Sequence, residues 1–87
     1  MKAVAIGKRE LLIGFMLAGV KERLETEDPN EALKYLYELE EKETDYLVLV
    51  ASGLYSKIEN EISEIQNRKP SYVFYRFSGG GIEWRKD

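Results

Sequence analysis

Tyr46-Leu47-Val48-Leu49-Val50-Ala51 is the most apolar stretch of this 87-residue chain, and it decides the fold class. It shows no alternation of apolar and polar residues, which is typical of a parallel strand buried on both faces. A second apolar run, from Ala3 to Ile6, is ended by Gly7 and has the same character. We therefore expect these two strands at the centre of one sheet.

Three helical patterns lie between the strands. The first runs from about Arg9 to Glu22, and the residues that carry it are Leu12, Phe15, Met16 and Gly19, with Leu11 and Ala18 beside them. Asp28-Pro29-Asn30-Glu31 marks the start of the second, because Asp caps helices, Pro suits the first helical position and Glu31 can reach back to the cap. This second helix is expected to end near Lys42.

The third helix is expected to start with Ser52 as its cap and to end before Pro70. Its inward face is formed by Leu54, Ile58, Ile62 and Ile65. Two further strands complete the pattern: a short edge strand at Leu24 to Thr26, and a last strand from Ser71 to Phe77 that Ser78-Gly79-Gly80-Gly81 ends.

Strands that alternate with helices predict βαβ units joined by right-handed crossovers. The predicted fold is an α/β domain with a small open parallel sheet of four strands, in the order 2-1-3-4. Helices cover both faces, as in three-layer receiver-like or Rossmann-like domains. Residues 1–78 are expected to form this single domain, and residues 79–87 a Gly-rich C-terminal tail.

The composition excludes much of enzyme chemistry. The chain has no Cys and no His, so it has no thiol nucleophile, Cys/His zinc site or imidazole base. Its 16 acidic and 13 basic residues give a net charge of -3 without a basic stripe, which argues against a nucleic-acid partner. No apolar run approaches the roughly 20 residues of a membrane span. We expect a soluble cytoplasmic protein.

Ligands of open parallel sheets bind at the carboxyl ends of the strands. A phosphoacceptor receiver domain would need clustered carboxylates there, but the central strand ends in Ala51-Ser52-Gly53 and the first is followed by Lys8-Arg9. Gly7 and the three glycines lack the spacing of a nucleotide-binding motif. No catalytic, cofactor-binding or metal-binding residue is predicted. A signalling or small-ligand domain that uses Lys8, Ser52 and Arg76 remains the alternative.

A partner surface is the other candidate site. Tyr72, Phe74 and Phe77 are expected to face opposite to Val73 and Tyr75 on a strand at the sheet edge. Such an edge invites a partner, which could also be a second copy of the chain; equally, helices could cover both of its faces. The predicted partner-binding residues are Lys57, Asn60, Glu61, Tyr72, Phe74, Arg76 and Phe77.

Five segments resemble a known family. Lys2 to Gly7 and the block Gly14-Phe15-Met16-Leu17-Ala18-Gly19-Val20 are similar to the start of the F subunit of archaeal and vacuolar-type rotary ATPases. Asp28 to Ala32, Asp45 to Val50, and Lys69-Pro70 with the strand after it match in the same order, so that the resemblance covers about residues 2 to 78.

The resemblance implies a non-catalytic subunit of the central rotor stalk that binds the coiled-coil D subunit. It would help couple ATP synthesis or hydrolysis to proton or sodium transport, and it would be peripheral on the cytoplasmic face of the membrane. The family usually has an acidic residue where this chain has Lys8-Arg9, so contacts of that loop are expected to differ. Members generally continue into a C-terminal helix, whereas only Gly79 to Asp87 follow here.

Overall fold

The structure is a computed structural model, and it describes residues 1–78 and 81–83. Its centre is a sheet in the order β2-β1-β3-β4-β5. The strands are β1 (Lys2–Gly7), β2 (Glu22–Glu25), β3 (Tyr46–Ala51), β4 (Val73–Ser78) and β5 (Gly81–Glu83). The first four pair in parallel and β5 pairs with β4 in antiparallel orientation. The predicted α/β class and the order 2-1-3-4 are confirmed.

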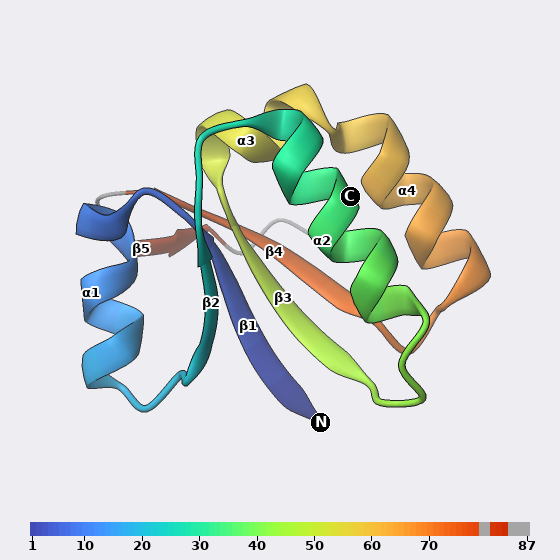
Figure 1. The fold of residues 1–87 in the computed structure, drawn as a ribbon, viewed down its shortest axis with the longest axis horizontal. Coiled ribbons are helices and arrows are strands. Elements are labelled where there is room, and N and C mark those ends of the chain that lie inside the picture. Colours follow the sequence, from blue (N-terminus) through green and yellow to red (C-terminus); the bar gives the residue numbers. More distant parts are fainter. Residues whose placement is uncertain (79–80, 84–87) are drawn as a thin grey trace.

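The helices are divided unequally between the two faces (Figure 1). Helix α1 (Arg9–Leu17) covers one face alone, whereas α2 (Pro29–Glu40), α3 (Ser52–Lys57) and α4 (Glu59–Arg68) cover the other. The larger core cluster lies under these three helices, and the smaller one lies under α1. The α1 side of the sheet is therefore the less covered one.

Helix α2 begins where the sequence predicts. The Asp28 carboxylate accepts a 2.9 Å hydrogen bond from the main-chain N–H of Asn30, and Pro29 is the first helical residue. The N–H of Asp28 donates to the hydroxyl of Thr26 at 3.0 Å, in place of the expected bond to Glu31. The N–H of the capping residue is thus satisfied by Thr26, three residues before Pro29.

Helix α1 ends at Leu17, so the prediction that it continues to Glu22 was wrong. Gly19 has a left-handed backbone with φ of 97°. The N–H of Gly19 donates to the carbonyl of Met16 at 3.1 Å, and that of Val20 to the carbonyl of Phe15 at 2.9 Å. This is the Schellman arrangement that stops a helix. Gly19 is a terminator, not part of the inward stripe, and β2 starts earlier than expected.

The predicted third helix is two helices. The backbone breaks at Ile58, which has φ of -123°, and its N–H donates to the carbonyls of Leu54 and Tyr55 at 3.2 Å each. Ser52 is the first residue of α3 and makes no capping bond with its side chain, so its predicted capping role was wrong. The predicted inward residues are nevertheless all buried, including Ile58 at the break itself.

Strand β4 is not an edge strand, contrary to expectation, because β5 pairs with it through residues 76–78 and 81–83. Phe77 packs in the α1-side cluster beside Tyr75, and Phe74 packs in the other cluster. The expectation that Phe77 faces away from Tyr75 was therefore wrong, since alternate residues of a strand share a face. Of the predicted tail, residues 79, 80 and 84–87 lie outside the described residues.

Candidate functional site

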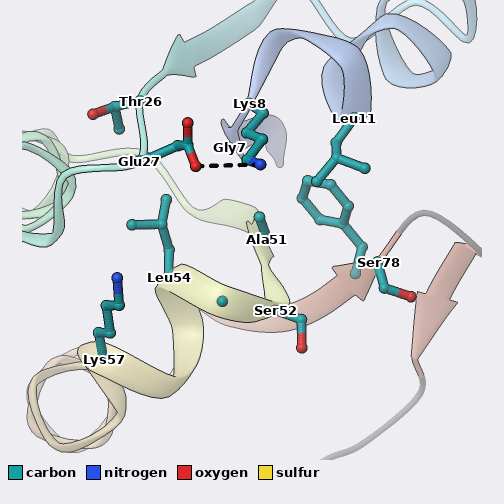
Figure 2. Close-up of a pocket in the computed structure, with 12 residues that line it drawn as sticks. Gly7, Lys8, Leu11, Thr26, Glu27, Ala51, Ser52, Leu54, Lys57 and Ser78 are labelled. Atoms are coloured by element: carbon teal, nitrogen blue, oxygen red, sulfur yellow. Dashed lines mark ion pairs between the residues drawn. The ribbon is translucent and has the colours of Figure 1, made fainter.

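A cavity of about 220 Å³ opens at the carboxyl ends of the strands, between β1 and β3, where the strand order reverses (Figure 2). This is the position at which open parallel sheets bind ligands. Its apolar wall is formed by Leu11, Ala51, Leu54 and Phe77, and its polar rim includes Lys8, Thr26, Glu27, Ser52, Lys57 and Ser78. The cavity is thus a shallow apolar pocket with charged groups only at its margin.

The cation nearest to β1 already has a partner. Lys8 Nζ lies 3.4 Å from Glu27 Oε1, and both side chains are largely exposed (Figure 2). An exposed pair of this kind is weak, but it neutralises the lysine where an anion would have to bind. Lys57 lies across the cavity, on the α3 side, and makes no ion pair with any residue that the structure describes.

Gly7 has a packing role at the bottom of this cavity. A Cβ at Gly7 would stand 2.8 Å from the Cβ of Ala51 and 3.4 Å from Cζ of Phe77. The missing side chain therefore lets the ends of β1 and β3 approach each other. This requirement explains the glycine without any phosphate group.

The described residues offer little chemistry at this edge. Among the side chains of residues 1–78, no group of three His, Cys, Asp or Glu is placed to hold a metal ion. Shifted titrations occur elsewhere: burial raises the pKa of Tyr35 and Tyr72, and the hydrogen bond from Arg68 lowers the pKa of Glu40. These groups stabilise the α2 side of the fold and do not line the cavity.

The residues of the alternative ligand site are only partly brought together. Lys8 and Ser52 both line the cavity. Arg76 does not, since its guanidinium carbon lies 4.6 Å from the ring centre of Tyr55 and packs over that ring. A cation that stacks on an aromatic face is already partly satisfied. Two of the three predicted groups therefore share one site.

The predicted partner-binding residues separate into two groups. Tyr72, Phe74 and Phe77 are at most 3% exposed, so their side chains form core and offer no surface. The others lie at or near the surface, where Lys57 and Asn60 are exposed and Glu61 and Arg76 are half-buried. The aromatic residues are inside because helices cover both faces of β4, which was one of the two expectations.

The exposed apolar side chains gather on α1 instead. Ile13, Met16 and Leu17 are 46%, 39% and 85% exposed, and we call them the α1 ridge. Met16 was expected to face inward, and Ile13 and Leu17 were given no role. The sequence does contain a signal for this surface. Ile13 and Leu17 are four residues apart, so they lie side by side on a helix, and both fall outside the inward stripe.

None of the helices in the described part of the chain has the length and apolar character required to cross a membrane.

Comparison with known proteins decides the family. The family model of the ATP synthase (F/14-kDa) subunit matches residues 3–75. The chain belongs to this family. A curated relative, the F subunit of the A-type ATP synthase of Methanocaldococcus jannaschii, is 31% identical over 65 residues, which cover 75% of this chain and 66% of the relative. No solved structure matched the chain.

Membership in the F subunit family confirms the resemblance seen in the sequence. The F subunit is a non-catalytic stalk subunit, which agrees with the prediction that this chain is not an enzyme. The relative is named as a subunit of an ATP synthase, and subunits of a complex contact one another. The strand-end cavity and the α1 ridge are two surface features of this chain from which a contact could be built.

Proposed function

We propose that this chain is the rotor F subunit of an A/V-type ATP synthase, which binds the coiled-coil D subunit in the central stalk. In this role it helps couple ATP synthesis or hydrolysis to proton or sodium transport. The observation that carries the proposal is the family match over residues 3–75, on a fold whose strand-end cavity is lined mainly by apolar side chains.

A stalk subunit would need a domain that keeps its shape, and several features of this fold are consistent with that need. The four parallel strands are packed between helices on both faces. Arg68 of α4 holds the carboxylate of Glu40 at the end of α2 with bonds of 2.6 and 3.0 Å. Among the described residues, no buried side-chain polar atom lacks a hydrogen-bond partner. Such a domain resists local opening.

The contact surface proposed from the sequence is retained only in its exposed part. Lys57, Asn60 and Glu61 lie around the junction of α3 and α4, and Arg76 lies on β4. These side chains are polar, so they would tune orientation and association rate more than they would anchor a complex. The proposed place in the cell is cytoplasmic, peripheral on the membrane face through the assembled complex.

Co-elution tests the proposal. The chain is mixed with the D subunit from the same source and passed over a size-exclusion column, with an unrelated coiled coil of similar length as the control. We expect a complex with the D subunit and none with the control. Absence of a complex with the D subunit at tens of micromolar would contradict the proposal.

The cavity at the strand ends supports a second candidate, a small-ligand or signalling domain. Lys8 and Ser52 line one pocket of about 220 Å³, which is a suitable size only for a small ligand. Titration of the ¹⁵N-labelled chain with Mg²⁺ and acetyl phosphate, and then with a nucleotide panel, tests this candidate. Amide shifts at these loops would support it, whereas flat titrations at millimolar ligand would eliminate it.

A further inference from the structure

We propose that the α1 ridge, together with Lys21 and Arg23, is the anchor of the subunit contact, and that it packs against an amphipathic helix of a partner subunit. That helix would carry an apolar stripe with carboxylates at the end that meets the two cations. The inference rests on the proposed function, because it takes the partner helix to belong to the coiled-coil D subunit.

The α1 ridge is strongly exposed for a set of apolar side chains. Large apolar side chains are seldom clustered in water without a reason, and Leu17 is 85% exposed. Ile13 and Leu17 are four residues apart, so they lie one above the other on the outer side of α1. Met16 widens this surface. The exposed apolar residues run along the axis of α1. A second helix can pack its side-chain ridges into the grooves of such a surface.

The fold itself does not require the ridge. The Schellman stop of α1 brings Val20 back to Phe15, and both are partly buried in the α1-side core cluster. Leu12 is the fully buried residue of the helix. Leu17 is thus neither the hydrophobic contact of the helix stop nor a member of the core. A residue of this kind contributes to something outside the chain.

Gly14 shapes the same surface. It lies inside α1, where glycine is unfavourable, and a Cβ built on it would meet nothing within 4 Å. The chain therefore has no packing reason for this glycine. Because Gly14 is three residues before Leu17, it leaves open helix backbone beside the ridge. A partner helix can approach closely at that point.

Two cations give the surface its polarity. Lys21 and Arg23 follow the helix, and neither makes an ion pair with a side chain of residues 1–78. Arg23 pairs with Ala5, whose side chain belongs to the α1-side cluster, so Arg23 projects on this face. Its guanidinium donates to the main-chain carbonyl of Lys21 at 3.3 Å, so the Arg23 charge lies beside the segment that follows the helix.

The opposite end of α1 borders a hollow lined by Lys8, Arg9, Glu10, Glu25 and Glu27, and Lys8 already pairs with Glu27 there. Parallel pairing with a second copy of the chain would bring Lys21 and Arg23 of both copies together, and like charges repel. The ridge is also only three side chains wide, well short of the roughly 800 Å² per partner of a standard interface. It suits one contact among several in a larger complex.

The test compares two matched variants in binding to the D subunit. Leu17→Glu places a charge on the ridge, and Tyr37→Glu places the same charge on an exposed apolar position of α2, on the other side of the sheet. Circular dichroism checks that both fold, and Leu17→Ser repeats the test without a charge. We expect the Kd to rise at least about tenfold for Leu17→Glu and less than about twofold for Tyr37→Glu.

The double variant Lys21→Glu/Arg23→Glu tests the polarity. We expect weaker binding at low salt and a smaller dependence of the Kd on ionic strength. Unchanged binding by the Leu17 variants, with the wild type binding, overturns the inference and leaves the proposed function standing. Failure of the wild type to bind the D subunit overturns both. Loss of a dimer of the chain itself in Leu17→Glu also overturns the inference, since a second copy would then be the occupant.

Discussion

The phenolic hydroxyl of Tyr72 donates a 2.7 Å hydrogen bond to the main-chain carbonyl of Leu39, although the two residues are 33 positions apart. The bond joins the residue before β4 to the last turn of α2. The Tyr72 ring also meets the ring of Tyr46 edge to face, with 5.7 Å between the ring centres. Tyr72, which the sequence suggested as a partner-binding residue, therefore joins α2 and β3 to the start of β4 within the core.

Removing this hydroxyl is expected to destabilise the fold modestly. Tyr72→Phe keeps the ring and loses the hydrogen bond, and the carbonyl of Leu39 keeps a second donor in the N–H of Lys42 at 3.0 Å. We expect a loss of about 1 kcal/mol in the free energy of unfolding, measured by urea titration. Binding to the D subunit should not change. A weaker complex with unchanged stability would show that Tyr72 is part of the interface after all.

Two glycines of the same region should respond to alanine with opposite signs. A Cβ added at Gly14 or at Gly19 would have no atom within 4 Å, but Gly19 has φ of 97°. Gly14→Ala is expected to stabilise the protein by about 0.5 to 1 kcal/mol through helix propensity. Gly19→Ala should destabilise it by about 1 kcal/mol, because an L-residue is strained at that φ. Equal effects in thermal unfolding would contradict the assignment of the helix stop.

Gly7 tests the close approach of β1 and β3. Its Cβ would stand 2.8 Å from the Cβ of Ala51, so Gly7→Ala must push the strand ends apart and should cost about 1 to 3 kcal/mol. Gly53→Ala is the control, since nothing lies within 4 Å there and Gly53 is already helical. The control is expected to be neutral or slightly stabilising. A Gly7→Ala protein as stable as the wild type would show that the two strand ends do not need to meet.

The pair Glu40–Arg68 predicts a pH dependence. The hydrogen bond from Arg68 lowers the pKa of Glu40 in the folded state below its ordinary value of 4.5. A lowered folded pKa adds stability that is present above pH 4.5 and is lost as the pH falls through the folded value. Glu40→Gln should therefore be less stable than the wild type at about pH 7 and approach it at about pH 3. Urea midpoints at the two pH values measure this, and a constant difference would refute the assignment.

The sheet could be predicted because its central strands are encoded locally. The run Tyr46 to Ala51 and the run Ala3 to Ile6 are apolar on both faces, which only a covered parallel strand tolerates. The start of α2 was equally explicit in Asp28-Pro29. Each of these signals is contained in a few consecutive residues, so each element could be predicted without tertiary information.

The errors lie where local signals conflict or are absent. Gly19 has the spacing of the inward stripe of α1, and its role as a stop depends on a backbone angle that the spacing does not reveal. The break at Ile58 is marked by neither Gly nor Pro. The buried hydroxyl of Tyr72 is satisfied by the carbonyl of Leu39, and the sequence around Tyr72 does not show a partner 33 positions away.

The partner surface stays a prediction, although the structure places Tyr72, Phe74 and Phe77 of it in the core. Ile13 and Leu17 were assigned to no surface. Their spacing outside the inward stripe was visible in the sequence, and the structure adds that α1 ends at Leu17 and covers its sheet face alone. Under the proposed function, such exposed apolar residues mark the place of a contact with another subunit.

The most direct test of the central claim, that this protein acts through surface contact in a stalk, is a heteronuclear NMR titration of the ¹⁵N-labelled chain with unlabelled D subunit. We predict saturable shifts or broadening centred on the amides of residues 13–23, with a dissociation constant in the micromolar range or below. Spectra that stay unchanged at equimolar D subunit and tens of micromolar protein would contradict the account.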